Sequence, residues 1–179
     1  MRSAMTQPEG VDNMSLLDLP FVLRTRRNHG LEHATIHILS ARVHARPLAG
    51  RSNSKGFYIL GNVPTEEVDV SVAEALQRMR NGEAHMAIHP GCGTNYLTAG
   101  VFAGLAAAAA VSIPWRSRVD KWSGAVMAST FALIFSAPVG PLLQARVTTS
   151  GEMGDLEIRS VRKLPGRMNM HFVETWSSA

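Results

Sequence analysis

The sequence has little of several features that would indicate particular functions. It contains a single cysteine, Cys92, so no disulfide can form within the chain, which fits a reducing compartment. No run of Lys and Arg is longer than a pair, and no basic stripe alternates with aromatic residues, so nucleic acid is not an expected partner. The Cys-x-x-Cys-His signature is absent, which argues against covalently attached haem.

Charged side chains are missing from two long stretches, residues 90–115 and 122–145. A membrane-spanning helix needs about 20 largely apolar residues, so we predict a two-helix transmembrane hairpin over residues 96–144, with spans near 96–114 and 124–144. Trp115 and Trp122 bracket the connecting loop, as interfacial aromatic residues do. Gly100 and Gly104 are spaced as in close helix–helix contacts. The alternative is a buried hairpin in a soluble protein, but so short a chain has little polar surface to cover one.

The expected localisation is therefore an integral membrane protein with two spans, in contact with lipid. The net charge of +4 and the pI near 9.8 fit a surface close to anionic lipid. Arg116, Arg118 and Lys121 in the short loop favour a cytoplasmic loop. That orientation would export residues 1–95, which carry no good signal peptide. We therefore expect the soluble domain and both termini in the cytoplasm, against the charges of the loop.

The remainder of the chain predicts an α+β fold with four parts. These are a flexible N-terminal arm (1–20), a His-rich α/β domain (21–95), the hairpin (96–144) and a C-terminal β-hairpin that completes the soluble domain (145–179). Apolar periodicity predicts a helix over 21–44 and a second one capped by Thr65. Strands predicted at 56–60 and 84–89 flank this second helix and form a βαβ-like unit in a small mixed sheet, with a loop at 45–55. Two further strands, 155–161 and 168–175, could join the sheet.

The N-terminal helix carries a His-x-x-Glu-His box made of His29, Glu32 and His33. Histidines at positions i and i+4 face the same way on a helix and can bind one Zn²⁺, while the glutamate between them could activate a metal-bound water. This order is that of the inverzincin peptidases. His37 and His44 lie on the same side of the helix.

A second group of candidate ligands follows at His85, His89 and Cys92, and both imidazole and thiolate bind zinc well. The predicted zinc site therefore consists of His29, His33, His89 and Cys92. If all four bind, the site is closed and structural. If His29 and His33 bind with water and one carboxylate, the site is open and hydrolytic. The carboxylate candidates are Glu66, Glu67, Glu74 and Glu83.

The box with its continuation Ala34-Thr35, the strand at 56–63 and the turn His89-Pro90-x-Cys92-Gly93-Thr94-Asn95 resemble an uncharacterised bacterial membrane-protein family with a domain of unknown function. This resemblance covers about residues 25–160 and implies no activity. The resemblance to inverzincin peptidases covers residues 29–33 alone, and the downstream carboxylate ligand of those enzymes has no identified counterpart here.

Three functions compete. The first is a membrane-anchored zinc hydrolase acting on a peptide substrate, with Glu32 as catalytic base. The second is a non-catalytic membrane module, whose structural His/Cys metal site supports assembly with a membrane protein partner. The third is a tetrapyrrole binder with histidine axial ligands. We favour the first because a purely structural site does not need Glu32.

Overall fold

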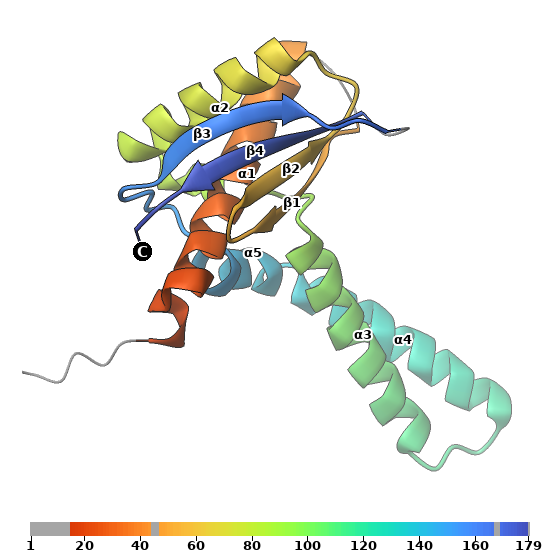
Figure 1. Cartoon of the computed structure of the whole chain (residues 1–179). Helices are drawn as coiled ribbons and strands as arrows, with labels where there is room; N and C mark the ends of the chain where they lie inside the picture. Colours follow the sequence, from red (N-terminus) through yellow and green to blue (C-terminus); the bar gives the residue numbers. More distant parts are fainter. Residues whose placement is uncertain (1–14, 44–46, 167–168, 179) are drawn as a thin grey trace, which may run out of the picture.

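The computed structural model describes residues 15–43, 47–166 and 169–178. Two helices pack on one side of a sheet, and a long helical hairpin projects away from this body (Figure 1). Most of the predicted N-terminal arm, residues 1–14, lies outside the described residues. The helices and strands are the 3₁₀ turn η1 (Leu16–Asp18), α1 (Pro20–Val43), β1 (Ala49–Asn53), β2 (Gly56–Leu60), α2 (Thr65–Arg80), the 3₁₀ turn η2 (Ala84–Ala87), α3 (Gly93–Ser112), α4 (Arg118–Ser136), α5 (Val139–Leu143), the π-helical turn η3 (Gln144–Thr148), β3 (Glu157–Lys163) and β4 (Met170–Trp176).

The sheet has the strand order β1-β2-β4-β3, and every neighbouring pair is antiparallel. The predicted α+β class, the strand at 56–60 and the C-terminal hairpin that joins the sheet are confirmed. The prediction of a mixed sheet with a βαβ-like unit is wrong, because no pair of strands in the described sheet is parallel.

The predicted strand at 84–89 is instead the single 3₁₀ turn η2. Its backbone closes a 3₁₀ turn, in which the N–H of Met86 bonds to the carbonyl of Glu83 at 3.1 Å, and it pairs with no strand of the described sheet. The turn packs against α1 and directs its backbone carbonyls toward the histidines of that helix.

The predicted loop at 45–55 contains a strand that its composition did not indicate. β1 is polar, but a two-residue connection, Ser54-Lys55, folds it back onto β2. Its Ser52 and Gly50 also contact α1, so tertiary contacts stabilise a segment of low strand propensity.

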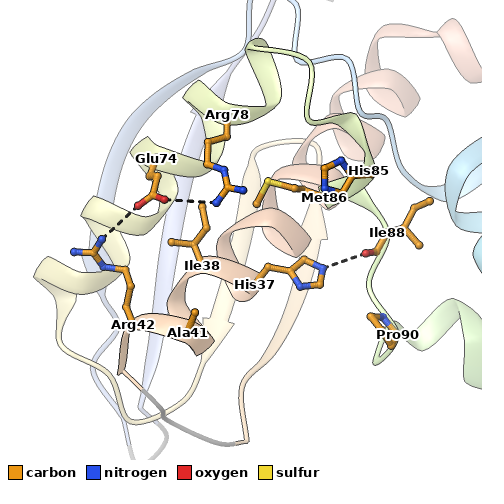
Figure 2. Close-up of a pocket in the computed structure, with 10 residues that line it drawn as sticks. All are labelled: His37, Ile38, Ala41, Arg42, Glu74, Arg78, His85, Met86, Ile88 and Pro90. Carbon is orange, nitrogen blue, oxygen red and sulfur yellow. Dashed lines mark hydrogen bonds and ion pairs between the residues drawn. The ribbon is translucent and has the colours of Figure 1, made fainter.

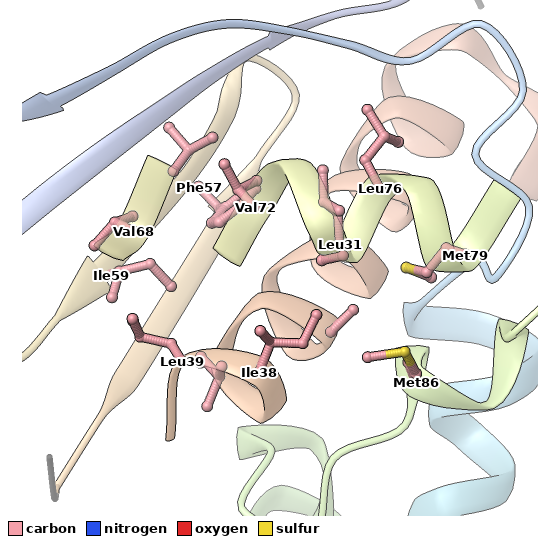
Figure 3. Close-up of a cluster of buried hydrophobic side chains, with 14 of the residues drawn as sticks. Leu31, Ile38, Leu39, Phe57, Ile59, Val68, Val72, Leu76, Met79 and Met86 are labelled. Atoms are coloured by element: carbon pink, nitrogen blue, oxygen red, sulfur yellow. The ribbon is translucent and has the colours of Figure 1, made fainter. Parts of the chain in front are cut away.

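The core lies between the sheet and helices α1 and α2 (Figure 3). Full burial of each large apolar side chain contributes about 1.5–3 kcal/mol. Thr65 is the first residue of α2 and not its cap, and its hydroxyl pairs with His171 of β4 at 3.1 Å. The largest fully buried apolar side chains of these elements are Leu31, Leu39, Phe57, Ile59, Val68 and Val72.

The hairpin consists of α3 and α4, which pack along each other (Figure 1). Within the part of the chain that the structure describes, α3 is the one helix that is long and apolar enough by itself to cross a membrane. α4 is long and apolar enough only when it is counted together with the following helical segment, Val139–Thr148. The two segments are bent by 47° relative to each other. Pro138 and Pro141 lie at this break, where proline commonly ends or kinks a helix.

The contact between the two hairpin helices does not use the predicted glycine pair. Ser129 of α4 donates a hydrogen bond to the carbonyl of Ala103 at 3.2 Å. A Cβ atom added to Gly100 or Gly104 would meet no atom within 4 Å, so these glycines face away from the contact.

Candidate metal centre

Helix α1 places the three residues of the His-x-x-Glu-His box at one end of a small cavity. His29 and His33 are one turn apart, and their ring centroids lie 4.4 Å from each other. Glu32 lines the same cavity, which has a volume of about 120 Å³. The i, i+3 and i+4 spacing that the sequence predicted thus brings all three side chains to one site.

Cys92 enters this site from the first turn of α3, where it is the N-cap residue. Its Sγ lies 3.4 Å from Nε2 of His29 and accepts the backbone N–H of Thr94 at 3.4 Å. One ligand atom from each of His29, His33 and Cys92 lies within 4.8 Å of the other two. A tetrahedral zinc ion holds its ligand atoms roughly 3.3–3.8 Å apart, so small side-chain adjustments would suffice to bind one. These three residues therefore form a group that could hold a metal ion.

Two backbone carbonyls orient the imidazole rings. Nδ1 of His29 lies 2.9 Å from the carbonyl of Thr148, and Nδ1 of His33 lies 2.6 Å from the carbonyl of Ala87. A carbonyl can only accept, so each Nδ1 carries a proton, and Nε2 is the nitrogen that offers a lone pair to a metal when the ring is neutral. Metal-binding histidines commonly have their second nitrogen held in this way.

Glu32 is 3% exposed and hydrogen-bonds to the hydroxyl of Ser52 on β1. Gly50 of the same strand packs directly on the carboxylate, since a Cβ there would lie 2.2 Å from Oε1 of Glu32. Burial raises the pKa of Glu32 more than the Ser52 hydrogen bond and the nearby His29 and His33 lower it. A carboxyl group with a raised pKa is better suited to accept a proton near neutral pH.

The electrostatics of the cluster favour a thiolate. Burial alone would raise the pKa of Cys92, but hydrogen bonds from His29, His33 and Thr94 lower it to about 5. For His29, burial lowers the pKa, yet the contacts with Cys92, Glu32 and Thr148 outweigh it and raise the pKa overall. Thiolate is the form of cysteine that binds metals.

His89, the fourth predicted ligand, lines the same cavity but lies outside the group of three. Its ring centroid is 5.5 Å from that of His33 and 4.8 Å from that of His37. Its Nδ1 accepts the backbone N–H of Gly91 at 3.0 Å. Burial and the neighbouring His37 and His33 lower the pKa of His89 to about 4.

The remaining candidate ligands are placed elsewhere. His37 pairs with the carbonyl of Ile88, His85 lines a neighbouring hollow, and His44 lies outside the described residues. None of the four candidate carboxylates belongs to the described group of three. Glu66 is exposed on α2, whereas Glu67, Glu74 and Glu83 form ion pairs with Arg42 or Arg78.

Several residues that hold the site were not expected from the sequence. The fully buried Gln144 accepts the backbone N–H of His89 at 2.9 Å and donates to the side chain of Asn95 at 2.7 Å. Ser52 and Thr148 contact Glu32 and His29. A lone glutamine in an apolar stretch is a usable signal for Gln144, but nothing in the local pattern indicates Ser52 or Thr148.

Comparison with known proteins places the site within a shared region. Residues 24–161 match a family described as "Domain of unknown function (DUF6391)", a range that includes the three candidate ligands and the helical hairpin. An uncharacterized protein from Picosynechococcus sp. is 34% identical over 139 residues, which make up 72% of this chain and 67% of that protein. No solved structure matches the chain.

Proposed function

This chain belongs to the DUF6391 family, whose function is unknown, and from the site that it builds we propose that it is a membrane-anchored, zinc-dependent hydrolase of the peptidase class. The observation that carries the proposal is the orientation of the two histidines. Both Nδ1 atoms are held by backbone carbonyls, both rings contact the Cys92 thiol, and Glu32 lines the same cavity.

Zinc fits the donors better than other common metals do. Two imidazoles and one thiolate suit zinc, whereas magnesium and calcium prefer oxygen ligands. Three protein ligands would leave one position of a four-coordinate zinc ion for water or substrate, as in catalytic zinc sites. The cavity beside the three candidate ligands, with a volume of about 120 Å³, has room for a single ion.

Glu32 supplies the group that removes a proton from the attacking water. It is buried beside the cluster, and its raised pKa has burial as its main cause. Its carboxylate is held by Ser52 and packed by Gly50, so it keeps one orientation. A held, partly desolvated carboxylate next to a metal is a suitable general base.

The membrane anchor is the hairpin of α3 and α4, with the bent segment after α4 completing a second span. Unlike the core helix of a soluble protein, α3 is little buried, with 11% of its apolar window covered by the rest of the chain. Large apolar side chains project from both helices, among them Tyr96, Leu97, Leu105, Ile134 and Phe135. A contiguous apolar surface of this kind needs lipid or a partner to cover it. A reduced Cys92 ligand favours the cytoplasm for the domain that holds the site.

The test compares full-length wild-type protein with Glu32→Gln in detergent, using fluorescently labelled casein as substrate. We expect wild-type protein to bind one zinc and to release labelled peptides, and chelation to stop the reaction. Glu32→Gln should keep its zinc and lose activity about 10²–10⁴-fold. Zinc-loaded wild-type protein that leaves casein intact, or activity that survives Glu32→Gln, would contradict the proposal.

A structural metal site is the second candidate, and one observation favours it. A metal bound to His29 and Cys92 would join α1 to the root of α3, and Thr148 at the other root of the hairpin holds His29. The protein would then be a membrane module that assembles with a membrane protein partner. In that case Glu32→Gln should weaken zinc binding about 10–100-fold, because the role of Glu32 would be to orient the neighbouring metal ligands.

A further inference from the structure

Strand β1 forms one edge of the sheet. It pairs with β2 on one side, and no strand among the described residues pairs with the other side. An edge strand presents a row of N–H and C=O groups to any chain that can pair with them. The opposite edge strand, β3, carries more charge, which discourages such pairing: Glu157, Arg159, Arg162 and Lys163.

The first residues of edge strand β1 border the cluster of His29, His33 and Cys92. Leu48, Ala49 and Gly50 form one wall of the cavity, and the segment from His89 to Gly93 contributes the other. Gly50 lies directly against the Glu32 carboxylate. A chain paired with β1 would therefore pass over the residues of the proposed reaction.

Two larger hollows border α1 beyond the cavity. A hollow of about 570 Å³ shares Ile36, Leu48 and His89 with the cavity. The next hollow, of about 500 Å³, shares His37, Ala41 and Pro90 with the second one (Figure 2). From Glu32 to Ala41 the helix rises about 14 Å, which is the length of roughly four extended residues.

The charges along these hollows do not form an anion site. Glu74 lies between Arg42 and Arg78 and pairs with both, as Figure 2 shows. Arg42 also pairs with Glu67, and Arg78 with Glu83. The other lining residues there are mostly apolar, including Ile38, Met86 and Ile88. Backbone groups on one wall and apolar surface beyond are complementary to an extended peptide.

Resting on the hydrolase function proposed above, we propose that the outer edge of β1 binds the substrate as an extended polypeptide, which adds a fifth strand to the sheet. Backbone hydrogen bonds to β1 align the chain, and the scissile peptide bond lies over the cluster of His29, His33 and Cys92. The neighbouring hollows take up apolar side chains. Main-chain pairing of this kind gives affinity with little dependence on sequence.

The test uses the full-length, zinc-loaded Glu32→Gln protein in detergent, which can bind peptide without cleaving it. The probe is a fluorescent pool of decapeptides with randomised side chains, and the control pool carries N-methyl groups on alternate backbone nitrogens. We expect the affinity for the methylated pool, measured by fluorescence anisotropy, to be at least about tenfold lower than that for the unmethylated pool, because methylation removes backbone donors. Zinc-free wild-type protein allows the same comparison without a substitution.

Hydrogen–deuterium exchange locates the bound peptide. The unmethylated pool should slow exchange in residues 49–53 and leave β3 unchanged. Equal affinity for the two pools, or equal protection of both edge strands, would overturn the inference. Protection of β1 that grows with protein concentration without peptide would also overturn it, since a second copy would then occupy the edge. If the protein cleaves casein but the peptide does not protect β1, strand pairing is refuted and the hydrolase function stands. If the peptide protects β1 but the protein binds no zinc or cleaves no casein, the hydrolase function is refuted and strand pairing stands.

Discussion

Oε1 of Gln144 accepts the backbone N–H of His89 at 2.9 Å, which joins the end of the hairpin to the turn that carries Cys92. Gln144 is fully buried, and its amide nitrogen also binds the side chain of Asn95. Asn95 in turn donates to the carbonyl of Pro90 at 2.8 Å. The approach of Cys92 to α1 thus depends on a buried polar network at the root of the hairpin.

We predict that Gln144→Leu destabilises the protein by about 1–3 kcal/mol, because two half-buried polar groups, the backbone N–H of His89 and the Asn95 side chain, lose their partner. The same change should lower zinc affinity about 10–100-fold, since the turn that carries Cys92 is no longer held. Unfolding in denaturant and competition with a zinc chelator measure the two effects. Gln77→Leu, at an exposed position of α2, is the matched control and should change neither. Equal behaviour of the two variants would refute this role of Gln144.

The hairpin predicts a second result, concerning membrane association. The wild-type protein should remain in the membrane pellet after washing with alkaline carbonate. Leu105 is exposed in the middle of α3, so Leu105→Arg should cost about 3–4 kcal/mol of insertion free energy and release part of the protein. Leu16→Arg, at an exposed leucine of η1, should leave the pellet fraction unchanged. Recovery of wild-type protein in the carbonate supernatant would contradict the membrane anchor.

The pH dependence of stability should report on Asp155, which ties the chain after β4 to α1. Hydrogen bonds from Ser177 and Ser178 hold the pKa of Asp155 well below its usual range, and Arg27 pairs with it at 3.1 Å. A carboxylate whose pKa is lowered by folding stabilises the fold at pH values above its pKa in the unfolded chain, which is about 3.9. This stabilisation is lost as the pH falls. Asp155→Asn should therefore destabilise the protein equally at pH 5 and 7.

Below about pH 4 the difference in unfolding free energy between wild type and Asp155→Asn should narrow, because Asp155 then takes up a proton in the unfolded chain while it stays ionised in the folded protein. Thermal unfolding in detergent across this range measures it. Asp69→Asn, an exposed position on α2, provides the comparison. A difference that widens in acid would show that Asp155 does not stabilise the fold as a carboxylate.

The sequence predicted those parts of the fold and site that depend on local spacing. Helical periodicity located α1 and α2, and the i, i+4 histidines met as expected because a helix fixes their separation. β1 and η2 were misassigned, since their conformations depend on contacts with α1 and β2. Gly30 shows the same limit: in the sequence it weakens a helix, yet it lets the carbonyl of Ser150 approach to 2.2 Å from where a Cβ would stand. The pairing of Cys92 with His29 joins residues 63 positions apart, which no local pattern could indicate.

Zinc K-edge X-ray absorption on the purified, full-length protein tests the metal centre most directly. We expect about one zinc per chain, with one sulfur ligand at about 2.3 Å and nitrogen or oxygen ligands at about 2.0–2.1 Å. The sulfur contribution should disappear in Cys92→Ser, and the His29→Ala, His33→Ala double variant should lose stoichiometric zinc while staying folded. A wild-type protein without bound metal, or a spectrum without sulfur, would contradict the metal centre of His29, His33 and Cys92.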